Sequence, residues 1–183
     1  MNRLRATSVL QSGDRIPDRD PARMPVFDTI TSLPWHPLVV HAVIVLLPLS
    51  CLGAVLVALR ADWNRLHGFL VLASAFVAAG AAVVAKESGE KLASRVGVPL
   101  DHSQWGKWVV VSAGLLFLSV AALWWLDRQH AEARTTAMKV LAVVQVVLAA
   151  VAFTVVVLAG HSGATAVWGP IVQHTQPGTF PVG

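Results

Sequence analysis

The chain has very few cysteines and few charged residues, and both shortages exclude kinds of protein. Cys51 is the only cysteine among 183 residues. An intrachain disulfide is therefore impossible, and a single thiolate cannot hold an iron–sulfur cluster. The CxxCH pattern that attaches haem covalently is absent as well. Asp, Glu, Lys and Arg make up 13% of the residues, whereas 55% are hydrophobic, and this balance indicates a membrane protein rather than a soluble one.

Four long apolar runs contain no Asp, Glu, Lys or Arg. They cover residues 38–59, 66–85, 108–126 and 140–160, and each has about the 20 residues that a helix needs to cross a bilayer. None alternates apolar and polar residues as a barrel strand would, and only helices and closed barrels satisfy their backbone hydrogen bonds in hydrocarbon. The sequence therefore predicts an all-α fold, an integral membrane bundle of four antiparallel helices.

Four spans in this order place both termini and the 86–107 connection on one side of the membrane. Four histidines then gather on that side: His36, His41, His102 and His161. His67 and His130 fall on the opposite side. Imidazoles clustered in a membrane protein suggest a bound metal or haem.

Two segments of different composition flank the predicted bundle, which covers residues 34–168. Residues 1–33 alternate Arg and Asp with Pro, so we predict a disordered polar arm that is not a signal peptide. Residues 169–183 contain three prolines, three glycines and no charge, which favours an interfacial tail over a fifth span.

The basic residues are dispersed, although the formal net charge is +4. No patch of basic and aromatic residues is present to hold a phosphate backbone, so nucleic acid is not an expected partner, whereas membrane lipid is. Basic residues are nearly balanced between the two sides, so their count does not set the orientation. The residues next to the first span and after the last carry no Lys or Arg, which favours the histidine-rich face being outside.

His41 is the first candidate ligand. Pro37 suits the first turn of a helix, and a rotation of 100° per residue then puts His36 and His41 about 140° apart. His41 lies one to two turns inside the span, where an imidazole needs a partner. A hydrogen-bonded core histidine is the alternative for His41. For His36 we favour an interfacial cap, with a ligand role as its alternative.

His161 and His102 are the candidates from the other spans. The fourth span closes in Gly160-His-Ser-Gly163, which predicts a helix end with an exposed imidazole. We favour a ligand or proton-relay role for His161, with an ordinary glycine stop signal as the alternative. His102 follows a predicted N-cap at Asp101, and a ligand and an ordinary polar residue at a helix start are equally open for it.

Together these motifs resemble an uncharacterised prokaryotic membrane family. The matching motifs are, in chain order, His36-Pro-Leu-Val-Val-His41, Ser88-Gly89, His102 and Gly160-His-Ser-Gly163. The family is a four-helix membrane domain of unknown function with an HPxxVH opening and a GHxG close, and the resemblance covers about residues 33–168. Some members look fused to, or associated with, Rieske-type domains. The resemblance implies a multi-pass protein of a prokaryotic plasma membrane that takes part in electron transfer.

One departure from the family concerns the opening motif. Such proteins commonly have VHFPI where this chain has Val40-His-Ala-Val-Ile44. The change removes a phenylalanine and a proline beside the first candidate ligand, so it leaves the role of His41 open.

The leading functional hypothesis is electron transfer through b-type haem. Haem needs two imidazoles from facing helices in an apolar slot, and we assign His41 and His161 as the axial ligands. His102 is a substitute ligand or a partner behind a ligand, and His36 lies at the same face. A quinone or a docked redox protein, such as a Rieske-type protein, would be the partner.

Two other hypotheses stay open. The histidines bind a transition metal directly or relay protons, although the broken helices or intramembrane carboxylate of a transporter are not evident. Alternatively, the chain is a structural subunit whose histidines only cap helices. Hydrolysis is not expected because no nucleophile and base occur together, so an electron-transfer or accessory subunit is favoured over a stand-alone enzyme.

Overall fold

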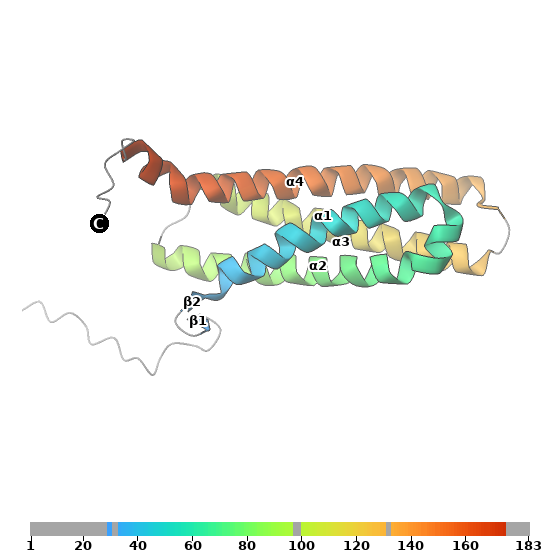
Figure 1. Cartoon of the computed structure of the whole chain (residues 1–183), viewed down its shortest axis with the longest axis horizontal. Coiled ribbons are helices and arrows are strands. Elements are labelled where there is room, and N and C mark those ends of the chain that lie inside the picture. The colour runs from blue at the N-terminus through green and yellow to red at the C-terminus, as the bar shows by residue number, and fades with distance from the viewer. Residues whose placement is uncertain (1–28, 31–32, 97–99, 131–132, 175–183) are drawn as a thin grey trace, which may run out of the picture.

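Four long helices form an antiparallel bundle in the computed structural model (Figure 1). The structure describes residues 29–30, 33–96, 100–130 and 133–174. The helices are α1 (Trp35–Leu59), α2 (Ala61–Val96), α3 (Leu100–Gln129) and α4 (Thr136–His174). Each is long and apolar enough to cross a membrane. The predicted all-α membrane bundle is therefore confirmed.

The helices follow one another around a ring. Each packs against the next along the chain and α4 closes the ring on α1, so α1 and α3 lie diagonally and make few contacts. The start of α1, the end of α2, the start of α3 and the end of α4 lie at one end of the bundle (Figure 1). We call it the histidine end because it holds His36, His41, His102 and His161.

A very short hairpin precedes α1. Its strands are β1 (Thr29–Ile30) and β2 (Leu33–Pro34), which pair antiparallel with Ile30 opposite Leu33. The remainder of the predicted disordered arm, residues 1–28 and 31–32, lies outside the described residues. Residues 175–183 of the predicted tail lie outside them too.

The fourth helix does not end where the glycines of the GHSG motif predict. It continues through Gly160 and Gly163 to His174 and includes Pro170 near its end. Its last turns, in dark red, extend past the other helices and bend (Figure 1). Glycine is tolerated in membrane helices because a continuous helix keeps every backbone hydrogen bond inside the segment. His161 therefore lies within α4, and part of the predicted interfacial tail is helical.

Small and branched apolar side chains form the interior of the bundle. Leu47, Leu116 and Val120 are fully buried, and Ala78 and Ala82 of α2 pack beside them. The small residues of α2 thus serve close helix packing. Only 28% of the most apolar windows of α2 and α4 is buried inside the protein. Most of their surface is apolar and exposed, so these helices contact lipid.

Candidate functional site

His36 lies in the first turn of α1, and α2 fixes the orientation of its ring. Its Nδ1 lies 2.9 Å from the Ala85 carbonyl oxygen and 3.3 Å from Oγ of Ser88. A carbonyl oxygen only accepts, so Nδ1 of the neutral ring carries the proton and donates. The Ser88 hydroxyl donates its own proton to the Ala85 carbonyl oxygen, at 3.0 Å, and so accepts from the ring. Nε2 of His36 is then unprotonated and keeps its lone pair.

His102 of α3 lies against α4 in the same way. Its Nδ1 lies 3.2 Å from Oγ of Ser162. Ser162 donates its single hydroxyl proton to the Ala159 carbonyl oxygen, at 2.9 Å. The serine therefore accepts from the imidazole, and Nδ1 of His102 is the donor. Nε2 of His102 again keeps a free lone pair.

A glycine follows each serine and leaves room for the ring. A Cβ atom on Gly89 would lie 2.8 Å from Cε1 of His36, and one on Gly163 would lie 2.9 Å from Cε1 of His102. Real Cβ atoms essentially never approach so closely, so any larger residue would push the ring away. Each helical hairpin thus contains one His–Ser-Gly unit: His36 with Ser88-Gly89, and His102 with Ser162-Gly163.

The two imidazoles meet across the diagonal of the bundle. Their ring centroids are 6.4 Å apart and their planes make an angle of 82°. Both side chains are half-buried. A metal bound about 2 Å from one nitrogen of each imidazole would hold the ring centres roughly 6 Å apart. The observed separation therefore matches two imidazoles that share one metal centre.

The two predicted axial ligands, His41 and His161, are not part of this pair. Both side chains are exposed. Nδ1 of His41 donates to the Pro37 carbonyl oxygen one turn earlier on the same helix. Among the described residues, ring contacts join His36 to His102 and involve neither His41 nor His161.

Helix geometry explains this difference. His41 follows His36 by five residues, so the two side chains point about 140° apart, as the sequence predicts. The side of α1 that packs on α2 carries His36, so His41 is on the outer side. On α4, Ser162 points inward to His102, and the adjacent His161 is rotated 100° away from it.

Few side chains that could bind a metal ion lie close together at the histidine end. No group of three or more His, Cys, Asp or Glu side chains that could hold a metal ion occurs in the part of the chain that the structure describes. Glu87 and Glu90, beyond the end of the predicted second span, form ion pairs with Lys86. The imidazole pair is therefore the candidate site.

The opposite end of the bundle contains a buried charge network that the sequence pattern did not predict. The Asp127 side chain is fully buried and accepts hydrogen bonds from Nδ2 of Asn64, at 2.7 Å, and from Nε of Arg134, at 2.9 and 3.1 Å. Arg134 also donates to the carbonyl oxygens of Val57 and Ala58, where α1 ends. We call this the aspartate end. Asp127 directly follows the apolar run of α3, and this position at a membrane interface does not by itself distinguish it from a solvated residue.

Comparison with known families places the chain in a family of membrane proteins. The model of a family described as predicted membrane protein (DUF2231) matches residues 32–176. This range holds all four helices and both His–Ser-Gly units, and it confirms the resemblance to an uncharacterised membrane family. No curated protein and no solved structure matches the chain.

Proposed function

The chain belongs to the DUF2231 family of predicted membrane proteins, and from this premise we propose that it binds b-type haem through His36 and His102 and transfers electrons in the membrane. The observation that carries the proposal is the imidazole pair. The two imidazoles, from diagonal helices, lie edge to face with their ring centroids 6.4 Å apart.

The hydrogen bonds behind the rings support a ligand role. Histidines that bind metals almost always donate their second ring N–H to a carbonyl, carboxylate or water, which fixes both tautomer and orientation. Here Nδ1 of His36 donates to the Ala85 carbonyl oxygen and Nδ1 of His102 to the Ser162 hydroxyl. A histidine that only capped its own helix would not need a partner on the next helix.

The number of donors favours haem over a bare metal ion. Structural zinc takes four protein ligands and catalytic zinc takes three, and no such group occurs among the described residues. Haem iron needs fewer protein ligands because the porphyrin supplies nitrogens of its own.

The interior of the bundle is apolar two helical turns beyond the pair. Seven residues after each histidine, and so on nearly the same side of the helix, lie Val43 and Val109, both buried in the core cluster. A haem held there would supply one-electron transfer. A membrane quinone or a redox protein such as a Rieske-type protein would exchange the electron, because the pair lies near one membrane face.

We also propose that the histidine end faces the outside of a prokaryotic plasma membrane. The residues directly before α1 and those of α4 after His161 include no Lys or Arg. An outside position for these two segments agrees with the preference of basic residues for the cytoplasmic side. Labelling of single cysteines introduced at Gln104 and at Arg60, in a Cys51→Ser background, with a membrane-impermeant maleimide in intact cells would test this orientation. Labelling of the Arg60 position alone would refute it.

The haem proposal is tested by the visible spectrum of the purified chain. The protein is extracted in mild detergent from haem-replete cells, and its dithionite-reduced spectrum is compared with its oxidised one. We expect a Soret band and an α-band, with one haem per chain by the pyridine haemochrome assay. His36→Ala and His102→Ala should each abolish the bands, whereas His67→Ala, at the aspartate end, should keep them.

A colourless but folded wild-type protein would refute haem binding. Metal analysis of the same samples separates the alternatives. A transition metal that is lost in both His36→Ala and His102→Ala would indicate direct metal binding, and no metal at all would indicate a structural subunit.

A further inference from the structure

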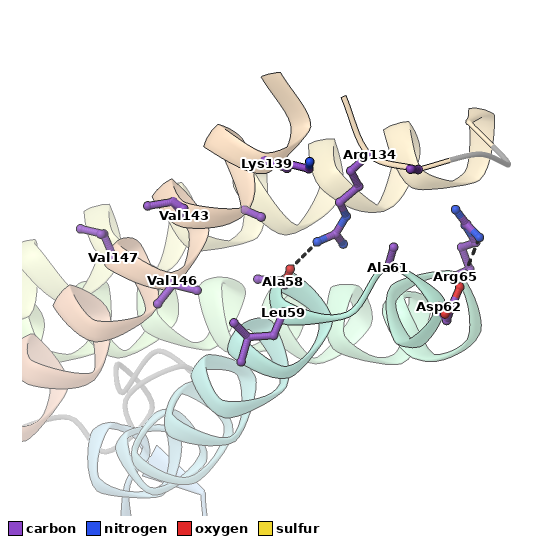
Figure 2. Close-up of a pocket in the computed structure, with 12 residues that line it drawn as sticks. Ala58, Leu59, Ala61, Asp62, Arg65, Arg134, Lys139, Val143, Val146 and Val147 are labelled. Carbon is purple, nitrogen blue, oxygen red and sulfur yellow. Dashed lines mark hydrogen bonds and ion pairs between the residues drawn. The ribbon is translucent and has the colours of Figure 1, made fainter. Parts of the chain in front are cut away.

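An open groove lies between the end of α1 and the start of α4, at the aspartate end (Figure 2). Its volume is about 800 Å³. The lining changes in character along the groove. Charged side chains line it near the helix ends, and apolar side chains of α1 and α4 line it further along (Figure 2). The charged residues are Asp62, Arg65, Arg134 and Lys139, and the main apolar ones are Leu59, Val143, Val146 and Val147.

The position of the groove relative to the membrane follows from the helix ends. The apolar run of α1 ends at Leu59, and α4 begins at Thr136, so the charged part of the groove lies at the level of the lipid headgroups. Val147 follows Lys139 by eight residues, which places it about 12 Å deeper along α4. Val143 and Val147 are 64% and 55% exposed. The apolar part of the groove therefore opens to the hydrocarbon region.

The charged part has a net positive charge. Arg134 is neutralised by the buried Asp127, and Arg65 forms an exposed ion pair with Asp62 at 3.3 Å. Among the described residues, the Lys139 ammonium has no ion-pair partner, and the first turn of α4 contains no acidic residue. One unneutralised cation thus lies at headgroup level directly above an apolar wall.

We propose that this groove binds a phospholipid with an anionic headgroup. The headgroup phosphate lies beside Lys139, and one acyl chain lies along Val143, Val146 and Val147. Basic pockets between membrane helices favour anionic headgroups. A soluble anion would use only the charged part of the groove and would leave the apolar wall exposed to lipid. A phospholipid fits both parts, and the surrounding bilayer supplies it.

The test is lipid binding to the full chain in detergent. The protein is delipidated, and phosphatidylglycerol or phosphatidylcholine with the same acyl chains is added before native mass spectrometry. We expect one phosphatidylglycerol per chain, bound several-fold more tightly than phosphatidylcholine. Lys139→Gln should weaken phosphatidylglycerol binding about five-fold, because one basic residue near a membrane contributes attraction of that order.

Two further variants test the position of the headgroup and the contact with the acyl chain. Lys107→Gln removes an exposed lysine of α3 at the histidine end and should leave the affinity unchanged. Val147→Trp keeps every charge but fills the apolar wall, and it should also weaken phosphatidylglycerol binding. Each variant is used only if its thermal unfolding matches that of the wild type.

Three results would overturn the proposal. They are equal binding of the two lipids, equal effects of Lys139→Gln and Lys107→Gln, and competition by inorganic phosphate or glycerophosphate as effective as that by phosphatidylglycerol. The last result would identify a site for soluble anions instead of a lipid site.

Discussion

At the aspartate end of the bundle, buried polar groups bind one another, whereas at the histidine end each imidazole uses one nitrogen and keeps the other free. Asp127 accepts from Asn64 and Arg134, and Arg134 also caps the end of α1. His36 and His102 donate through Nδ1 to fixed partners and leave Nε2 unprotonated. The first arrangement neutralises its two buried charges within the chain and so stabilises the fold, although Oδ1 of Asn64 is buried without a hydrogen-bond partner. The second orients two imidazoles whose Nε2 lone pairs are not used by the hydrogen bonds that fix the rings.

Removal of the buried carboxylate should have the largest effect on stability. Asp127→Ala leaves the Arg134 guanidinium buried without its counter-charge, which typically costs about 3 to 5 kcal/mol. Thermal or denaturant unfolding in detergent measures the loss. Asp62→Ala is the matched control, because the Asp62 side chain is 91% exposed and its ion pair with Arg65 is at the surface. Equal effects of the two changes would show that the Asp127 network is not structural.

The glycines that contact the rings should come next. Gly89→Ala and Gly163→Ala place a Cβ atom against Cε1 of His36 or His102. Such overpacking costs about 1 to 3 kcal/mol, and it should also displace the imidazole and reduce haem content. Unfolding and the reduced-minus-oxidised spectrum are the two measurements.

Gly80→Ala and Gly114→Ala are the controls for these changes, since an added Cβ meets nothing within 4 Å at either position. Alanine should raise helix stability there by up to about 1 kcal/mol. If all four variants behave alike, the close approach of ring and glycine has no energetic role.

Replacement of the serines should affect the two His–Ser-Gly units to different extents. Ser162→Ala removes the only described acceptor for Nδ1 of His102, whereas after Ser88→Ala the His36 ring still donates to the Ala85 carbonyl oxygen. Each change should cost about 1 kcal/mol of stability. Loss of a group behind a ligand typically lowers metal affinity about 10- to 100-fold, and we expect that loss for Ser162→Ala and a smaller one for Ser88→Ala. Haem titration of the apoprotein would measure it, and the reverse order would contradict the assigned tautomers.

The smallest effects are expected for the two exposed histidines. His41→Ala and His161→Ala remove side chains outside the imidazole pair, and surface changes of this kind usually alter stability by less than about 0.5 kcal/mol. Haem content per chain should stay at the wild-type level in both. Loss of the haem bands in either variant would support His41 or His161 as an axial ligand, as the sequence predicts, and would contradict the His36–His102 pair.

The fold could be predicted from the sequence because it depends on the length and the lack of charge of four apolar segments, which can be read directly from the sequence. Runs without charge must cross the membrane as helices, and their order then brings the four histidines to one end. The 140° angle between His36 and His41 could also be predicted. The side of α1 that faces the bundle could not, because contacts with α2 decide it. Glycine can end a helix or allow a neighbouring group to approach it closely. Only the structure shows that Gly163 makes room for the His102 ring.

The aspartate end could not be predicted for a related reason. Asp127, Arg134 and Asn64 each resemble an ordinary polar residue near a helix end, and such residues are usually solvated. Their pairing depends on where the ends of α1, α2 and α3 meet. The hydrophobic pattern of the sequence does not determine that position.

The repeated His–Ser-Gly unit makes the histidine end of this single chain resemble an interface between two identical subunits. The α1–α2 hairpin and the α3–α4 hairpin each contribute an imidazole from the first helix and a serine and a glycine from the second. A flat ligand without such symmetry then has two nearly equivalent ways to lie between the halves. If the proposed haem binds there, freshly reconstituted protein should contain two rotational isomers of it, in proportions set by the side chains in which the hairpins differ.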